Sequence, residues 1–589
     1  MPESSMKRRH SLLYLAPYLA RHRHHLAVGF LMVLLTVMAG MASPWVLKYV
    51  VDSLRVSLAP EKLLPYAGMI LAIALVEGFF RFWMRKILIG ASRDIEYEIR
   101  NDFFAHLQKM PLSFFQAYKT GDIMSRATND LNAVRSVLGP GIMYSMNTIV
   151  TVFVASAILI SINWKLTLLA YLPLVLVSVT VKKLGQRIHD RFQEIQGQLS
   201  EISAKVQENL SGVRVVKAFA QEESELLQFE RLNQEYIRRN VSLIRLWGIF
   251  YPLMSALIGL SSVALVWMGG REVVAGRLTL GEFVAFMSYL SLLTWPTIAV
   301  GWVINIFQRG SASMTRILEI VEEPPGIRDA PGATAPEKIE GAIEVRDLSF
   351  QYTHASGYAL HNISFKVAAG ETLAIVGHTG SGKSTLINLL PRLFDPPPGT
   401  VFIDGKDVRE WPLSELRKNI GYATQESFLF SETIRDNIVF GREPEIPDRE
   451  VEWAARVSQI DDDIQQFPQK FQTVVGERGI TLSGGQKQRV TISRAVLVLP
   501  RILVLDDALS SVDTLTEEKI LNQLSAVMRE RTTILVSHRI STVRNAHQII
   551  VLQDGAIVER GAHESLMARQ GIYADLYQKQ LLEEELASV

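Results

Sequence analysis

Two adjacent aspartates follow a short apolar run in ILVLDDALSSVD, which extends from Ile502 to Asp513. Four apolar residues in a row predict a buried parallel strand, because both faces of such a strand are covered. The strand would end at Asp506, where a carboxylate can hold a metal ion beside a phosphate group. Because side chains alternate along a strand, Asp507 should point the other way and act on a water molecule near a γ-phosphate.

A glycine-rich stretch, GHTGSGKST, occupies Gly377 to Thr385 and matches the pattern G-x-x-x-x-G-K-[ST]. It lies between the apolar strand TLAIVG and the helical stretch STLINLLPRLF. Glycines let backbone N–H groups converge on phosphate oxygens, and the following helix adds positive potential at its N-terminus. Lys383 is expected to reach the β- and γ-phosphates, and the Ser384 hydroxyl is expected to bind Mg²⁺. The motif therefore predicts binding of a nucleoside triphosphate.

A second glycine turn occurs in LSGGQKQR, from Leu482 to Arg489. Ser483 and the two glycines after it precede the helical stretch QKQRVTISRAVLVL, so they form another possible anion site at a helix N-terminus. Because the chain already has one phosphate loop, this second turn is expected to serve the nucleotide of another subunit.

Long uncharged runs in the first half of the chain predict membrane-spanning helices. Leu26 to Leu47 contains 22 residues without a charge, enough at 1.5 Å per residue to cross a hydrocarbon core of about 30 Å. The third and fourth spans should be joined by a tight turn near Ser161-Ile162-Asn163. The other candidate spans are Leu63 to Met84, Ser136 to Trp164, Leu166 to Val181, Trp247 to Gly270 and Phe283 to Gln308.

The second candidate span carries two charged residues, Glu77 and Arg81. They are four positions apart, so on a helix they can pair with each other and face a cavity instead of lipid. The alternative is that this end of the helix has already left the bilayer.

Basic residues indicate the orientation of the spans. MKRRH and ARHRHH precede the first span, whereas the segment from Tyr49 to Leu63 after it has only Arg55 and Lys62 as basic residues. The N-terminus should therefore be cytoplasmic, and with six spans the C-terminus should be cytoplasmic too. The expected location is the cell inner (cytoplasmic) membrane. Long charged connections, RDIEYEIRNDFFAHLQKM and HDRFQEIQGQLSEISAKVQENL, indicate helices that continue beyond the membrane on the cytoplasmic side.

Composition sets the broad class of the protein. The chain has 589 residues, a net charge of +1 and no cysteine, which indicates more than one domain, excludes disulfides and gives no sign of nucleic-acid binding. A linker, EEPPGIRDAPGATAPEKIEG, separates the spans from alternating strands and helices. We expect a six-helix all-α transmembrane domain at 1–321, a linker at 322–341 and an α/β P-loop nucleotide-binding domain at 342–589.

Together these features resemble an ATP-binding cassette (ABC) exporter half-transporter, and the resemblance covers nearly the whole chain. Members of that family are dimers with two ATP sites, each built from the phosphate loop of one chain and the LSGGQ of the other. The resemblance implies ATP and Mg²⁺ as cofactors, and a second half-transporter and the lipid bilayer as partners. It implies ATP-driven export of an amphipathic drug or lipid by alternating access.

Further site residues follow from the resemblance. Tyr352, 25 positions before Gly377, resembles the aromatic residue that stacks on adenine. Gln425 in YATQESFLF resembles the Q-loop glutamine that contacts Mg²⁺ and water, and His538 in ILVSHR resembles the switch histidine that senses the γ-phosphate. SSVD, ending at Asp513, resembles the D-loop.

Three more segments resemble family elements. TVVGERG, from Thr473 to Gly479, resembles the X-loop of exporters. FFQAYKTGDIMSRATND and ENLSGVRVVKAFAQE resemble the elbows of the two intracellular loops that dock on the cassettes.

The expected site residues fall into three sets. The catalytic residues are Asp507, His538 and Gln425, and the metal ligands are Ser384, Gln425 and Asp506. The nucleotide contacts are Tyr352, Gly377, Thr379, Gly380, Ser381, Gly382, Lys383, Ser384, Thr385, Ser483, Gly484, Gly485, Gln486 and Asp513.

The chain departs from the family pattern at the catalytic base, where Asp507 replaces the usual Glu. Asp is one methylene shorter, which withdraws the carboxylate by about 1.5 Å, and a misplacement of that size can lower the rate on the order of 10²-fold. The site on this chain's own phosphate loop should therefore bind ATP and hydrolyse it slowly. Two smaller departures are Thr424 in place of Pro and Ser-Ser-Val-Asp in place of Ser-Ala-Leu-Asp.

An Asp at this position with an intact LSGGQ resembles the degenerate-site subunit of heterodimeric ABC exporters. A heterodimer is therefore the favoured assembly, and a homodimer with two slow sites is the alternative. An ATP-gated channel or regulator is a third possibility, although the chain has neither a regulatory insertion nor a long charged tail.

Aromatic and methionine side chains in the spans suit an amphipathic cargo, although each can equally face lipid or pack between helices. They are Trp295, Met287, Tyr289, Tyr251 and Met254.

Overall fold

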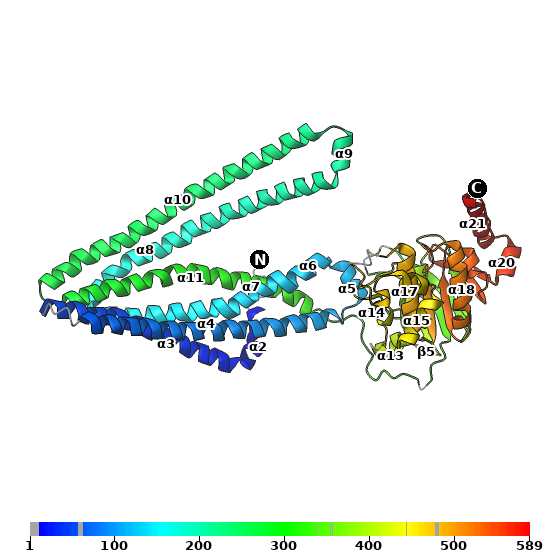
Figure 1. Ribbon diagram of the computed structural model, residues 1–589, viewed down its shortest axis with the longest axis horizontal. Helices are drawn as coiled ribbons and strands as arrows, with labels where there is room; N and C mark the ends of the chain where they lie inside the picture. The colour runs from blue at the N-terminus through cyan, green and yellow to red at the C-terminus, as the bar shows by residue number, and fades with distance from the viewer. Residues whose placement is uncertain are drawn as a thin grey trace. The chain divides into compact units, whose positions relative to one another are not determined.

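The computed structural model describes residues 11–56, 63–336, 338–353, 355, 357–442, 445–476 and 482–588. The chain divides into two compact units. One contains the chain up to Gln108 together with Lys119–Glu323, and the other contains Lys109–Tyr118 and the chain from Pro324 onward. The first unit is helical and the second is α/β (Figure 1), which is the expected combination of fold classes.

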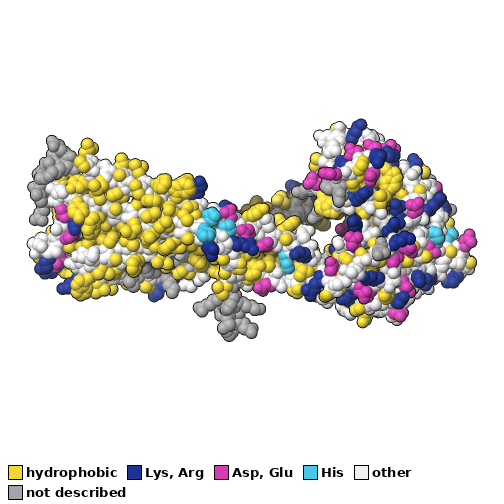
Figure 2. Space-filling view, turned by 90° about the horizontal axis from the view of Figure 1, so that it is seen from below, with side chains coloured by type: hydrophobic (Ala, Val, Ile, Leu, Met, Phe, Trp, Pro, Cys, Tyr) yellow, Lys and Arg dark blue, Asp and Glu magenta, His cyan; other side chains and the backbone are white. Residues whose placement is uncertain are grey.

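The helical unit is dominated by long helices that are apolar along much of their length. Among the described residues, five helices are long and apolar enough to cross a membrane. Figure 2 shows hydrophobic side chains over most of the visible face of this unit, whereas acidic and basic side chains are mixed over the α/β unit. The long helices are α3 (Arg23–Val56), α4 (Leu63–Leu107), α8 (Ile142–Ser211), α10 (Glu222–Val274) and α11 (Leu280–Val321).

Short helices complete this unit, including two π-helical turns. They are η1 (Leu12–Leu15), α2 (Ala16–Arg21), α6 (Thr120–Ser125), the π-turn Arg126–Asp130, α7 (Leu131–Ser136), the π-turn Val137–Gly141 and α9 (Val213–Ala218).

Helix α8 contains the predicted turn between the third and fourth spans. Its backbone leaves the helical region at Asn163, whose φ and ψ are −161° and 105°. The Asn163 side chain then accepts hydrogen bonds from the N–H groups of Lys165 and Leu166, both at 3.1 Å, and so caps the second arm. Ser156 and Tyr171, 15 positions apart, are hydrogen-bonded through their hydroxyls. In a straight helix they would be about 22 Å apart, so the chain reverses direction here.

The second arm of α8 and helix α10 run side by side and are joined by α9 (Figure 1). Lys205 of α8 forms an ion pair with Glu225 of α10 at 2.6 Å, and Asn209 donates to the same carboxylate at 2.7 Å. These contacts lie on the charged segments beyond the predicted spans, as expected for helices that continue outside the membrane.

Buried carboxylates also hold the extensions of the other helices together. Glu96 of α4 is 4% exposed and lies near three guanidinium groups, those of Arg93 at 3.0 Å, Arg100 at 2.6 Å and Arg135 of α7 at 3.4 Å. Burying a carboxylate costs free energy unless charged partners and hydrogen bonds replace its hydration. The cluster therefore fastens α7 to α4.

The α/β unit contains two sheets. A six-stranded sheet has the order β10-β9-β3-β8-β7-β6, in which β9, β3, β8, β7 and β6 are parallel and β10 is antiparallel. Its strands are β3 (Thr372–Val376), β6 (Ile420–Ala423), β7 (Ile502–Asp506), β8 (Thr532–Val536), β9 (Gln548–Gln553) and β10 (Ala556–Gly561). A four-stranded antiparallel sheet contains β1 (Ile343–Phe350), β2 (Leu360–Val367), β4 (Val401–Ile403) and β5 (Lys406–Asp407).

Helices surround these sheets, and α5 belongs to this unit although it lies between α4 and α6 in the chain. Every residue of β3, β7 and β8 is buried, as expected for central parallel strands. The helices are α5 (Leu112–Ala117), α12 (Lys383–Leu389), η5 (Val408–Glu410), α13 (Leu413–Lys418), α14 (Ile434–Val439), α15 (Asp448–Val457), α16 (Asp461–Gln466), η6 (Lys470–Gln472), α17 (Gly484–Leu497), α18 (Thr514–Met528), α19 (Ile540–Val543), α20 (His563–Arg569) and α21 (Ile572–Ser588).

The Pro- and Gly-rich linker is attached to the α/β unit by hydrogen bonds. Asp329 accepts from the N–H of Leu413 at 2.8 Å, and the carbonyl of Thr334 accepts from Lys406 at 2.6 Å. Arg392, which is 2% exposed, donates to the carbonyl of Arg328 at 3.3 Å. The linker thus lies along the surface of this unit.

Replacing Glu96 by Gln should destabilise the helical unit, because three guanidinium groups would lose their shared counter-charge. The expected cost is on the order of 2 kcal/mol, seen as a lower midpoint of thermal unfolding of the full chain in detergent. Asp94→Asn is the matched control, because Asp94 is exposed on the same helix. Equal midpoints for the two variants would contradict a stabilising role of the cluster.

Candidate functional site

The phosphate-loop motif follows β3 and has the backbone geometry that only glycine adopts easily. Gly377, Gly380 and Gly382 have φ angles of +151°, +84° and +100°. A Cβ on Gly377 would lie 2.2 Å from the carbonyl oxygen of Leu552, so a larger residue cannot be accommodated there. The loop is therefore closed by backbone packed against backbone.

Lys383 begins α12 and turns back over the loop. Its ammonium group donates to the carbonyl oxygens of Gly377 at 2.8 Å and His378 at 2.9 Å. Burial lowers the pKa of Lys383, and the charges of Asp506 and Asp507 oppose that shift. The ammonium group thus has two neutral acceptors that an anionic ligand could replace.

Most of the predicted site residues line one cavity of about 570 Å³. It lies where the carboxyl ends of β3, β6, β7 and β8 meet, the edge at which parallel sheets bind ligands. The predicted residues in its wall are Tyr352, Thr379, Gly380, Gly382, Lys383, Ser384, Thr385, Gln425, Asp506, Asp507 and His538.

Asp506 is the last residue of β7 and is 4% exposed. Burial raises its pKa, whereas a hydrogen bond from the Ser384 side chain and the charge of Lys383 oppose the rise. Together with Gln425, these side chains offer oxygen atoms to a cation. Mg²⁺ is typically bound by one or two carboxylates plus substrate phosphates, so the residues present fit that ion.

Asp507 does not point away from Asp506 as strand alternation predicted, because both carboxylates line the same cavity. The strand ends at Asp506, and Asp507 has a left-handed backbone with φ of +47°. Its N–H donates to the carbonyl of Val536 at 2.9 Å, and its own carbonyl accepts from the hydroxyl of Ser510 at 2.9 Å. Alternation therefore no longer applies, and the turn directs the second carboxylate into the site. Asp is enriched among the residues that adopt this backbone conformation.

His538 follows β8 and enters the cavity from the neighbouring strand. Burial and the charge of Lys383 lower the pKa of His538 below its usual 6.5. The imidazole is therefore neutral at pH 7, with one nitrogen that donates and one that accepts a hydrogen bond.

Tyr352 lies beyond β1 and is held by contacts on two sides. Its hydroxyl donates to Thr385 of the phosphate loop at 3.0 Å, and its ring makes edge contacts with Phe350 and Phe394 at centroid distances of 5.1 and 5.0 Å. It therefore joins the apolar core to the wall of the cavity.

The remaining predicted ligands lie outside the cavity wall. Gly377 and Ser381 belong to the loop backbone, and the buried Ser381 hydroxyl has no hydrogen-bond partner in the described structure. Asp513 caps α18 by accepting from the N–H of Thr516 at 2.9 Å.

The LSGGQ segment is exposed and begins α17. The Ser483 hydroxyl accepts from the N–H of Gln486 at 3.2 Å, and the Gln486 side chain accepts from the N–H of Ser483 at 2.9 Å, forming a capping box. Ser483 and Gly484 are exposed, and a Cβ on Gly485 would lie 2.9 Å from the carbonyl of Ser511. This segment therefore packs on the D-loop and leaves its serine open to solvent.

The two predicted intracellular-loop motifs lie in different units. Phe114 of α5, in the predicted first intracellular loop, is 3% exposed and belongs to the α/β unit. Helix α9, in the second loop, belongs to the helical unit and has no buried residue. Of the predicted X-loop, residues 477–479 lie outside the described residues.

Residues that the sequence analysis did not anticipate also line the cavity, notably Tyr358, Asp554 and Gly555. Asp554 and Gly555 form the tight turn between β9 and β10, with φ of +49° and +78°. The Gly555 N–H donates to the carbonyl of Ser381 at 3.2 Å. An Asp-Gly pair between two strands is a recognised hairpin signal, so the turn, although not its contact with the phosphate loop, was detectable.

The predicted cargo residues of the spans do not share one surface. Trp295 lines a cavity inside the helical unit, whereas Tyr289 is fully buried and donates to the carbonyl of Met41 at 2.7 Å. Tyr251 is 64% exposed, Met254 is buried, and Met287 packs against the core around Tyr289.

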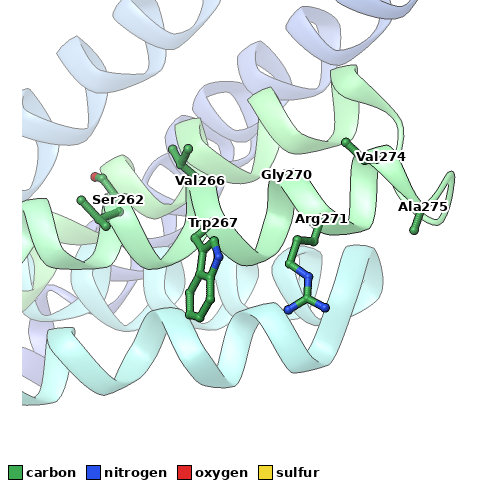
Figure 3. Close-up of a pocket in the computed structure, with 8 residues that line it drawn as sticks. Ser262, Val266, Trp267, Gly270, Arg271, Val274 and Ala275 are labelled. Atoms are coloured by element: carbon green, nitrogen blue, oxygen red, sulfur yellow. The ribbon is translucent and has the colours of Figure 1, made fainter.

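A shallow groove of about 990 Å³ runs along α10 near its end. Figure 3 shows the side chains of Trp267 and Arg271 extending to the same side of this helix. A tryptophan and an arginine together at a helix end are typical of a membrane interface.

Both units match known protein families. Residues 26–297 match the family described as the ABC transporter transmembrane region, and residues 360–510 match the family described as ABC transporter.

Relatives match over nearly the whole chain. The chain is 36% identical over 547 residues to the "Probable multidrug resistance ABC transporter ATP-binding/permease protein YheI" of Bacillus subtilis (strain 168), covering 92% of this chain and 93% of that protein. It is 36% identical to the "Multidrug resistance-like ATP-binding protein MdlA" of Escherichia coli (strain K12), with coverage of 96% and 95%.

Similarity extends to a lipid flippase and to a solved structure. The chain is 35% identical to the "ATP-dependent lipid A-core flippase" of Syntrophus aciditrophicus (strain SB), covering 88% of this chain and 86% of that protein. The structure of a bacterial Atm1-family ABC exporter with ATP bound superposes with a TM-score of 0.76 at 29% identity, covering 95% of this chain and 99% of the other.

Replacing Tyr352 by Ala should raise the Kd for ATP about tenfold, because stacking on a base contributes about 1–3 kcal/mol. Tyr352→Phe should leave the Kd nearly unchanged, since the ring remains and only the hydrogen bond to Thr385 is lost. Binding of a fluorescent ATP analogue to the full chain measures both. Tyr358→Ala is the matched control, because Tyr358 lines the same cavity. A loss confined to the Tyr358 variant would assign stacking to that residue instead.

Proposed function

Because the chain belongs to the family of ABC transporters and is an exporter half-transporter, we propose that it forms one half of a heterodimeric pump for amphipathic molecules. The pump binds ATP with Mg²⁺ and moves its substrate out of the cytoplasmic leaflet or the cytoplasm. The observation that carries the proposal is the division of one chain's nucleotide chemistry between two places, the cavity at the phosphate loop and the exposed LSGGQ turn.

The exposed turn supports a dimer. Ser483 and Gly484 are open to solvent at the N-terminus of the 14-residue helix α17, where N–H groups and the helix dipole favour an anion. They do not line this chain's own cavity. A γ-phosphate bound on a partner's phosphate loop is the anion that this turn is suited to bind.

Transport follows from linkage between ATP and the two conformations. ATP contacts both cassettes only when they are closed, so it binds the closed state more tightly and shifts the population towards it. Closure of the cassettes moves the helices that carry α5 and α9, and the substrate cavity between the membrane helices then opens outward. Hydrolysis removes the γ-phosphate that bridges the two cassettes, and the substrate cavity then opens towards the cytoplasm again.

Within this chain, six side chains of the nucleotide cavity share the work. Lys383 and the loop N–H groups hold the phosphates, Ser384 and Asp506 provide oxygen ligands for Mg²⁺, and Tyr352 stacks on adenine. Neutral His538 donates a hydrogen bond to the γ-phosphate. Asp507 orients a water molecule from a short side chain, which makes this site slow.

Slow hydrolysis at the Asp507 site favours a partner chain whose own site has the usual catalytic Glu. LSGGQ is intact in this chain, so it completes the partner's site, where hydrolysis occurs. The mass of the native assembly, isolated from its own cells in detergent, tests this arrangement. Two different chains are expected, and two copies of this chain with rapid ATP turnover would establish the homodimer instead.

Asp507→Glu should increase ATP turnover by this chain about tenfold or more, because the carboxylate regains about 1.5 Å of reach. Phosphate release is measured with this chain alone in lipid. The protein concentration is one at which native mass spectrometry shows a dimer of the chain. Asp507→Asn should abolish the remaining turnover, and Asp507→Glu combined with Lys383→Ala checks that the gain arises at this site. Rapid turnover by the unmodified chain, with no gain from Glu, would show that Asp is a sufficient base.

The absence of cysteine in the chain allows a direct test of its orientation. A cysteine at Ala275, between α10 and α11, should react with an impermeant maleimide on intact spheroplasts. A cysteine at Ser224, in the first turn of α10 and exposed, should react only after lysis. The reverse pattern would contradict the proposal that the termini and the cassettes lie on the cytoplasmic side of the inner membrane.

A further inference from the structure

The helical unit encloses a cavity of about 380 Å³ between α3, α4, α8 and α11. Much of its wall is apolar and includes Met84, Met143 and Trp295. The polar side chains of the wall are Thr36, Glu77, Arg81, Arg85, Asn147 and Thr151. Glu77 and Arg81 both lie in the cavity wall. This amphipathic lining suits a molecule with an apolar body and a polar end.

Charge in this cavity is not balanced. Glu77 forms an ion pair with Arg81 one turn away, and its carboxyl group lies beside Gly40 of α3. Arg85, one turn further along α4, lines the same cavity and has no ion pair among the described residues. The cavity thus carries one uncompensated positive charge.

A groove of about 530 Å³ along α4 meets the cavity at the same two arginines. Arg81 and Arg85 line both spaces. The other cations of the groove are engaged: Lys86 lies 4.8 Å from the ring centroid of Trp83, and Arg93 is paired with Glu96. Arg85 therefore lies where a ligand would pass from the groove into the cavity.

The position of Arg85 along α4 indicates the level of the charge in the bilayer. The predicted second span ends near Met84, and α4 continues to Leu107 on the side assigned to the cytoplasm. An arginine at that level lies near the head groups of the cytoplasmic leaflet. The apolar side chains of the cavity wall, among them Met84, Met143 and Trp295, are available to a lipid tail.

We propose that Arg81 and Arg85 form the head-group subsite for a lipid with one anionic group, which enters along α4 from the cytoplasmic leaflet and places its apolar part in the cavity. Guanidinium groups bind phosphate in a bidentate manner, so two of them can hold one phosphodiester. Glu77 neutralises Arg81 when the subsite is empty and disfavours a second acidic group. The inference rests on the proposed function, because this lipid is the substrate of the same export route.

Native mass spectrometry of the full-length assembly in a neutral detergent tests the subsite, with dioleoylphosphatidylglycerol and dioleoylphosphatidylcholine as the probes. Arg85→Gln should weaken binding of the anionic lipid about tenfold, the loss of one charge-assisted contact, and leave the zwitterionic lipid unchanged. Arg85→Lys should retain part of the binding, because the charge remains and the bidentate contact is lost. Arg271→Gln is the matched control, because Arg271 lies in the open groove of α10 (Figure 3).

Equal losses in the Arg85→Gln and Arg271→Gln variants would reduce Arg85 to a general head-group contact and overturn the subsite, as would no loss in either. The measurement needs no ATP hydrolysis. Selective binding of the anionic lipid without ATP-driven export from vesicles would contradict the proposed function and leave the subsite standing. Export without a preference for the anionic lipid would contradict the subsite alone.

Discussion

Close packing of backbone against backbone at the phosphate loop is the constraint on which the nucleotide site depends. The loop after β3 contacts the β9–β10 turn so closely that Gly377 has no room for a Cβ beside the carbonyl of Leu552, and the N–H of Gly555 donates to Ser381. A Cβ on Gly382 would lie 2.8 Å from the carbonyl of Ala359. Because the loop cannot relax, Lys383 and Ser384 begin α12 at one defined place, opposite the carboxylates that end β7.

Membrane segments face a different constraint, because charged helix extensions must be held together outside the bilayer. Buried carboxylates serve that purpose in two clusters. Glu96 joins α4 to α7, and Asp130 accepts a hydrogen bond from Ser313 at 2.9 Å and pairs with Arg316 of α11. The hydrophobic effect is available to these extensions only along narrow seams, so ion pairs carry much of their specificity. Rigid extensions are what an ATP-driven pump needs in order to transmit closure of the cassettes.

Helix α17 links the two halves of the nucleotide chemistry within one chain. At its N-terminus, Ser483 caps the helix, and one turn later the buried side chain of Gln488 donates to the Ser510 hydroxyl at 2.9 Å and accepts from the N–H of Ser511 at 2.8 Å. The Ser510 hydroxyl in turn donates to the carbonyl of Asp507. The helix that begins at Ser483 is therefore linked to the backbone of Asp507 through two hydrogen bonds, Gln488 to Ser510 and Ser510 to the Asp507 carbonyl. Such a path gives occupancy of one site a physical route to the other.

The sequence by itself determined the classes of structure and most of the site. Glycine spacing, apolar runs and buried strands predicted the phosphate loop, the long apolar helices and the central strands, because each depends on residues close together in the chain. The turn at Asn163 belongs to the same class, since a single asparagine side chain caps the following arm.

Only the tertiary structure decided how distant segments meet. It brought Tyr358 and the Asp554-Gly555 turn into the nucleotide cavity, and it directed Asp507 to the same side as Asp506 through a left-handed turn that strand alternation does not describe. It also placed Arg85 between a groove and a cavity formed by four helices. Such meetings depend on packing between elements far apart in sequence, and local patterns carry no information about them.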